Sequence, residues 1–147
     1  MASLIDRIIR TLNSGSSRSA RDQAILDAAF IFEKSRGHAP AGWSQEVILS
    51  AFSDADIARL KSALVEFIRN RNKACWSLGK SYDPALKPIY IEVLRRDMDA
   101  DPYELYQALI ALSNLGEPVF QNRASTGVDE EQANRISAQI YLASQDL

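Results

Sequence analysis

The sequence predicts an all-α protein, and three observations support this prediction. Apolar residues recur three and four positions apart along almost every segment, which is the period of an amphipathic helix. No segment shows the sustained period-two alternation of a half-buried strand. Serine, aspartate, glycine and proline occupy the places where these helices would begin and end. The 147 residues suffice for one domain, residues 1–147, with a core of its own.

The first two predicted helices lie on either side of a polar turn, residues 13–19. The first follows Ser3, a candidate N-cap, and its apolar residues share one face: Leu4, Ile5, Ile8, Ile9 and Leu12. The second covers about residues 20–35, and Gly37 is a candidate C-cap just beyond it. A loop over residues 38–43 is expected next.

Two further helices are predicted before residue 70. A short one begins after Ser44, and a longer one follows residues 53–56, where Ser53 and Asp56 resemble a capping box. The inner face of the longer helix has five apolar residues: Ile57, Leu60, Leu64, Phe67 and Ile68. The polar residues 70–73 are expected to break the chain.

The second half of the chain predicts four more helices. One passes through residues 74–78 and is ended by the Tyr-Asp-Pro step at residues 82–84, because a residue before proline disfavours the helical region. The others are expected at residues 86–98, 103–115 and 129–144, with Pro102 at the first turn of the second and Gly116 as its cap. We therefore expect seven or eight helices in the chain.

Residues 73–84 align without gaps on residues 107–118, an offset of 34 residues. The paired positions are Ala74 with Ala108, Leu78 with Leu112, Asp83 with Glu117, and Pro84 with Pro118. A small residue lets two helices approach closely, and the leucine fills the layer between neighbouring hairpins. The acidic-proline step ends each helix. This spacing suits one helical hairpin per repeat.

These residues resemble a HEAT-like repeat of the type found in phycobilisome lyases. The matching residues are Arg71, Ala74, Leu78, Gly79, Asp83 and Pro84 in the first unit, and Ala108, Ala111, Leu112, Gly116 and Pro118 in the second. The second unit departs at Leu105, where the family has arginine, and at Ser113, where it has glycine. The resemblance covers about residues 54–118. It implies a right-handed stack of helical hairpins (HEAT-like αα repeats) with N- and C-terminal capping helices.

The charge pattern and apolar content bear on function. With a net charge of −2 and a pI near 5.4, the chain has no basic footprint for nucleic acid, which argues against a HEAT-type DNA-repair enzyme. No apolar run is long enough for a membrane span, and charged residues interrupt residues 1–12. One cysteine excludes an internal disulfide. We expect a cytoplasmic protein.

The residue types that usually carry out chemistry lack partners in the sequence. His38 lies in a Gly-Pro loop, and Cys75 is expected to be a buried core residue. Asp97, Asp99 and Asp101 lack the glycine and distal glutamate of a calcium loop and suit a turn and a helix cap better. We therefore expect no catalytic residue, no metal ligand, no cofactor and no enzyme activity.

Aromatic and basic residues provide the candidate partner-binding site. They lie on or beside the second helix of each expected hairpin, which lines the concave face of a HEAT stack: Arg71, Lys73, Trp76, Lys80, Tyr82, Tyr103 and Tyr106. Their positive charge favours a partner with an acidic surface. The alternative is that Trp76 and Tyr106 only pack between hairpins.

Residues 115–120 and 141–142 resemble the tail of small bacterial immunity-type proteins. That resemblance implies that the chain binds and neutralises a cognate toxin with an acidic surface patch. The alternative is a regulatory or assembly subunit of another complex, and a second copy of the chain is a further candidate partner.

Overall fold

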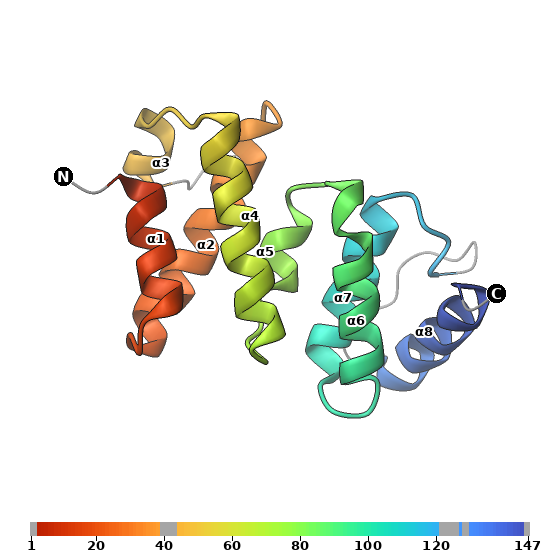
Figure 1. The fold of residues 1–147 in the computed structure, drawn as a ribbon. Coiled ribbons are helices and arrows are strands. Elements are labelled where there is room, and N and C mark those ends of the chain that lie inside the picture. Colours follow the sequence, from red (N-terminus) through yellow and green to blue (C-terminus); the bar gives the residue numbers. More distant parts are fainter. Residues whose placement is uncertain (1–2, 39–43, 121–126, 128–129, 146–147) are drawn as a thin grey trace. The chain divides into compact units, whose positions relative to one another are not determined.

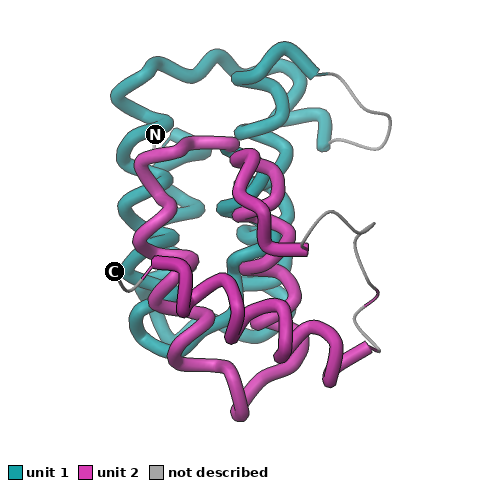
Figure 2. Tube along the Cα trace, turned by 90° about the vertical axis from the view of Figure 1, so that its right-hand side faces the viewer, with its two compact units in different colours: residues 1–81 teal, residues 82–147 magenta. Residues whose placement is uncertain are grey.

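The computed structural model describes residues 3–38, 44–120, 127 and 130–145. Within these residues it has eight α-helices, one short 3₁₀ helix and no strand (Figure 1). The all-α prediction is confirmed. The chain forms two compact units, residues 1–81 and residues 82–147 (Figure 2).

The first unit contains five helices: α1 (Leu4–Asn13), α2 (Arg18–Ser35), α3 (Gln45–Leu49), α4 (Asp54–Arg69) and α5 (Cys75–Gly79). The three long helices α1, α2 and α4 contact one another, while α3 packs on α2 and α5 packs against both α2 and α4. The predicted apolar faces of the long helices point into this core. Its largest fully buried side chains are Ile5, Ile31, Phe32, Leu60, Leu64, Ile68 and Leu78.

Serine caps determine where four of these helices begin. The hydroxyl oxygens of Ser3, Ser17, Ser44 and Ser53 each accept a hydrogen bond from a backbone N–H three residues later, at 3.1–3.2 Å. The cap at Ser17 starts α2 two residues earlier than the sequence predicted. At α4 the capping box is confirmed, because the backbone N–H of Ser53 also donates to Asp56 at 3.1 Å.

Lys34 and Ser77 of the first unit each donate to backbone carbonyls of an element that is distant in sequence. The Lys34 ammonium donates to the carbonyl oxygens of Val47 and Ile48, at 3.0 and 2.8 Å, and also to that of Ser50. These carbonyls lie at the C-terminal end of α3, which a cation stabilises. The buried Ser77 hydroxyl on α5 donates to the Ile25 carbonyl on α2 at 2.8 Å.

The second unit contains η1 (Pro84–Leu86), α6 (Lys87–Asp97), α7 (Pro102–Asn114) and α8 (Glu131–Gln145). Helices α6 and α7 form a hairpin, and α8 contacts both (Figure 1). The largest buried side chains are Tyr90, Leu94, Leu105, Leu109 and Leu112. Asp101 caps α7 by accepting from the N–H groups of Tyr103 and Glu104, both at 3.1 Å, so its predicted capping role is confirmed.

A polar network joins α8 to the rest of the second unit. The buried Tyr141 hydroxyl donates to Glu117 Oε1 at 2.6 Å, and the Lys87 ammonium lies 2.8 Å from the same oxygen. The hydrogen bonds from Lys87 and Tyr141 hold the pKa of Glu117 below its ordinary value. Burial, together with the hydrogen bond to Glu117, raises the pKa of Tyr141.

The two halves of the 34-residue repeat differ in local structure. Ala74 immediately precedes the five-residue helix α5, whereas Ala108 lies in the middle of α7. Leu78 and Leu112 are both fully buried, as the repeat requires. Helix α5 ends at Gly79, before the Tyr-Asp-Pro step that was expected to end it, and Pro84 instead opens η1. The two repeat units therefore agree in which leucine is buried but differ in the length of their helices.

Candidate functional site

Three helices of this chain end in the same hydrogen-bond motif. After α2, α4 and α7, the next two N–H groups beyond the C-cap donate back to carbonyls of the last turn at 2.9–3.2 Å, which defines a Schellman motif. The first residue beyond each C-cap is left-handed: Gly37 with φ 83°, Arg71 with φ 68° and Gly116 with φ 85°. Two of the three positions have the expected glycine, and the third has arginine.

Arg71 differs from the two glycines in its conformational cost and in its exposure. An L-residue with a side chain is disfavoured in the left-handed region. Arg71 is exposed, and within the described part of the chain its guanidinium forms no ion pair or hydrogen bond. The turn itself is held by Asn72, whose backbone N–H and side-chain amide both donate to the Phe67 carbonyl, at 3.2 and 3.0 Å.

The other predicted residues of the first unit lie on or next to α5. Lys73 is exposed in the segment before α5, and Trp76 is half-buried in the helix. The Lys80 ammonium lies 5.5 Å from the centre of the Trp76 ring and forms a cation–π contact with it. The two residues are one helical turn apart in the sequence. Lys80 also approaches Glu33 at 3.9 Å, and its carbonyl accepts from Arg36 at 3.1 Å. The structure therefore brings Trp76 and Lys80 together. It also places Glu33 and Arg36, at the end of α2, in contact with Lys80.

The remaining predicted residues are three tyrosines of the second unit. Tyr103 is 46% exposed in the first turn of α7, and Tyr106, one turn further along, is half-buried. Tyr82 is 40% exposed and has φ 49°, so Tyr82 and Arg71 are the two non-glycine residues with left-handed backbone in the described chain. Tyr103 and Tyr106 thus lie on neighbouring turns of one helix.

The formal charge of the chain is divided unevenly between the two units. Residues 1–81 contain twelve Lys and Arg against eight Asp and Glu, a net charge of +4. Residues 82–147 contain five Lys and Arg against eleven Asp and Glu, a net charge of −6. The predicted basic residues therefore all belong to a basic unit, and the near-neutral total conceals this difference.

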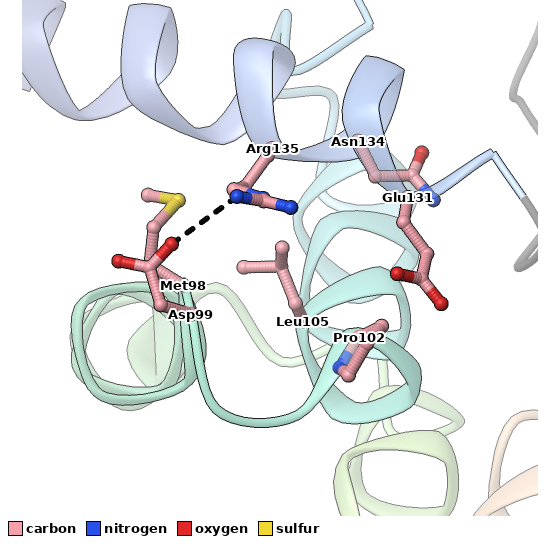
Figure 3. A pocket seen from close by; sticks show the side chains of 7 residues that line it. All are labelled: Met98, Asp99, Pro102, Leu105, Glu131, Asn134 and Arg135. Atoms are coloured by element: carbon pink, nitrogen blue, oxygen red, sulfur yellow. Dashed lines mark hydrogen bonds and ion pairs between the residues drawn. The ribbon is translucent and has the colours of Figure 1, made fainter.

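A pocket of about 160 Å³ lies where the α6–α7 turn meets the start of α8 (Figure 3). Its lining residues are Met98, Asp99, Pro102, Leu105, Glu131, Asn134 and Arg135. Arg135 lies 3.4 Å from Asp99 across the pocket (Figure 3), and the Asn134 amide donates to the Gly127 carbonyl at 3.0 Å. Among the described residues that line this pocket, the polar side chains are carboxylates, an amide and a guanidinium.

His38 and Cys75 lie in different environments. His38 is exposed, and Cys75 is fully buried in α5, as predicted for a core cysteine. In the described ranges, no three His, Cys, Asp or Glu side chains are placed to hold a metal ion. None of the described helices is long and apolar enough to cross a membrane.

Sequence reasoning missed several surface features. Glu33 and Arg36 contact Lys80 from more than forty positions away, and no local pattern indicates such a contact. Ile136 and Ile140 are exposed on the outer face of α8, where a helical period alone would have assigned them to either face. Leu49, in the short α3, is 79% exposed.

The chain was compared with protein-family models, curated proteins and solved structures. No family model matches it, and neither a curated protein nor a solved structure is significantly similar.

Proposed function

We propose that this chain is a protein-binding module that recognises an acidic surface on its partner. The observation that carries the proposal is the segment around α5. There the exposed Arg71 and Lys73 precede the Trp76–Lys80 pair, within a unit whose net charge is +4. Arginine and aromatic side chains are the commonest energetic anchors of protein interfaces, and clustered positive charge steers an acidic partner.

The second unit supports the same proposal with different residues. Tyr103, exposed in the first turn of α7, presents a large aromatic ring with a polar hydroxyl, a combination enriched at interfaces. Tyr106 lies one turn further along α7 and is half-buried. We include Tyr82 because its exposed ring lies on a left-handed residue that glycine would occupy more readily.

The scaffold we propose for these residues is HEAT-like. The consecutive, contacting pairs α4–α5 and α6–α7 would be the two hairpins, with α1 to α3 and α8 as the capping helices. The buried Leu78 and Leu112 at equivalent repeat positions support this assignment. The short α5 is its main departure from a regular repeat.

The specific form that we propose is an immunity protein that neutralises a cognate bacterial toxin. This role requires a rigid shape and a complementary charged patch, and it requires no chemistry of the binding protein itself. The resemblance of residues 115–120 and 141–142 to immunity-type proteins supports it. The second candidate, a regulatory or assembly subunit, would use the same surface for a partner that is not toxic.

Growth rescue tests the immunity assignment. Cells express the product of each gene adjacent to the coding gene, alone or together with this chain. We expect one adjacent product to inhibit growth and the wild-type chain to restore it. The double variant Arg71→Ala/Lys73→Ala should restore growth less, because it removes two exposed positive charges from the proposed surface.

Arg10→Ala is the matched control, because Arg10 is also an exposed arginine of the first unit but lies on α1. It should rescue growth as the wild type does. A stable complex with a non-toxic neighbour would favour the subunit alternative. If no adjacent product is toxic and none forms a complex with the chain, the immunity assignment is wrong.

A further inference from the structure

We infer that Arg71 is kept in its left-handed conformation for its side chain, which binds a carboxylate of an acidic protein partner. This inference rests on the proposed protein-binding function and assigns a specific contact within it. Its basis is the comparison of the three Schellman motifs.

The two glycines show what this backbone position requires. A Cβ placed on Gly37 or on Gly116 would meet no atom within 4 Å, so space does not demand glycine at either site. Glycine is favoured there because of φ alone. The same motif after α4 therefore carries an avoidable conformational cost at Arg71.

Within the described chain, the Arg71 side chain makes no contact that offsets the cost of its left-handed backbone. Its guanidinium forms no ion pair or hydrogen bond there, and Asn72 makes the contacts that close the turn. Asparagine tolerates the left-handed region better than arginine does. Yet Asn70 and Asn72 occupy the positions on either side of Arg71. A residue that is strained, exposed and without a structural contact is a candidate for function.

The charges around Arg71 indicate the chemistry of its ligand. Arg69, Arg71 and Lys73 lie within five consecutive positions, and all three are exposed. A guanidinium with five free donors matches a carboxylate in a bidentate geometry. A nucleic-acid surface would need a longer basic stripe than these three residues provide. An Asp or Glu side chain on a protein is therefore the ligand that we assign.

The first measurement needs no partner and tests the strain. Arg71→Gly should raise the Tm of the full chain by about 2–4 °C, because it relieves the left-handed cost. Gly37→Arg, at the equivalent position after α2, should lower Tm by a similar amount. Suppose that Gly37→Arg lowers the Tm but Arg71→Gly leaves it unchanged or lowers it. The Arg71 side chain then offsets its backbone cost by stabilising the fold, and the inference is wrong.

The second measurement tests the carboxylate ligand with hexaglutamate as the probe. The peptide is titrated into the ¹⁵N-labelled full chain at low salt, and amide shifts are followed. We expect shifts at residues 69–73 that vanish at high salt and weaken at least about fivefold in Arg71→Gly, with Arg10→Ala unchanged. Equal binding by wild type and Arg71→Gly would overturn the inference. So would tighter binding of hexathymidylate, which would point to nucleic acid.

The third measurement uses the toxin or subunit identified by growth rescue or complex formation. Arg71→Gly should weaken its Kd about tenfold, and Arg71→Lys should lose less because it keeps the charge without the bidentate geometry. A partner that binds wild type and Arg71→Gly equally overturns this inference but leaves the proposed function standing. If no partner exists, the proposed function fails while the strain and hexaglutamate results still decide the role of Arg71.

Discussion

The two compact units are built from the same helical material but differ in charge and in aromatic type. The first has a net charge of +4 and the second −6. Both tryptophans, Trp43 and Trp76, belong to the first unit, while all five tyrosines belong to the second: Tyr82, Tyr90, Tyr103, Tyr106 and Tyr141. The difference teaches that secondary structure alone says little about what either unit recognises, and it also gives each unit its own spectroscopic signal.

The units also differ in how their helices are tied together. The first has side chains that reach backbone carbonyls, as with Lys34 at the end of α3 and Ser77 on Ile25, and it also has ion pairs between helices, as between Arg59 on α4 and Asp6 on α1. The second uses a side-chain network in which Glu117 joins Lys87 to Tyr141. Each unit should therefore depend on pH through a carboxylate of its own, because the pKa of Asp6 beside Arg59 and the pKa of Glu117 beside Lys87 are both lowered.

The largest expected effect comes from removing a core leucine in either unit. Leu64→Ala in α4 and Leu109→Ala in α7 each leave a cavity at a fully buried site and should cost about 2–5 kcal/mol. Urea unfolding is followed by tryptophan fluorescence for the first unit and by tyrosine near-UV dichroism for the second. The predicted single domain requires both signals to shift together in each variant. If each variant shifts only the signal of its own unit, the single-domain prediction is wrong.

The next effect is confined to the second unit. Tyr141→Phe removes a buried hydrogen bond to the Glu117 carboxylate and should cost about 1.5 kcal/mol near pH 7. Because the folded pKa of Glu117 is lowered, the contribution of this carboxylate is complete above its ordinary pKa. The difference between wild type and Tyr141→Phe should therefore shrink as pH falls below about 4.3.

Tyr141 itself has the opposite dependence on pH. Its pKa is raised, so its contribution is complete below its ordinary pKa and is lost as pH rises through the folded value. Urea unfolding of wild type and variant from pH 3 to pH 8 measures the acid side of this difference. A pH-independent difference would contradict the assigned role of Glu117.

The smallest effect compares one helix cap from each unit. Ser53→Ala removes the capping box of α4, and Asp101→Ala removes two hydrogen bonds at the start of α7. Each should cost about 1 kcal/mol. The aspartate should cost more, because its charge also interacts with the helix dipole. Thermal unfolding at low and high salt measures both losses of stability. If Ser53→Ala and Asp101→Ala lose the same amount, the expected contribution of the aspartate charge is wrong.

Local signals were sufficient for most of the fold. Serine caps, Gly37 and Gly116 act within a few residues, so the sequence could place the ends of α1, α2, α4 and α7 closely. The exceptions have physical reasons. Ser17 caps α2 two residues before the predicted start, and α5 ends at Gly79 because Asp83 and Pro84 open the separate helix η1 in place of ending α5. Local sequence patterns also did not mark the division between the units after Ser81.

The candidate site was less predictable, since it depends on contacts and on backbone conformation. The Trp76–Lys80 pair has the spacing of one helical turn, so the sequence could indicate it. The contact of Lys80 with Glu33 joins two residues that are far apart in the sequence, so neither segment alone could indicate it. The left-handed backbone of Arg71 is visible only in the structure, because nothing about an arginine between two asparagines predicts it.

The most direct test of the proposed binding surface is hydrogen exchange of the full chain with and without its bound protein partner. We predict that the partner slows exchange at residues 70–82, around α5, and in the first turns of α7, near Tyr103. Exchange in α1 should be unchanged, because Arg10 and its neighbours lie outside the proposed surface. Protection confined to α8, at the exposed Ile136 and Ile140, or to α3, at Leu49, would contradict the account.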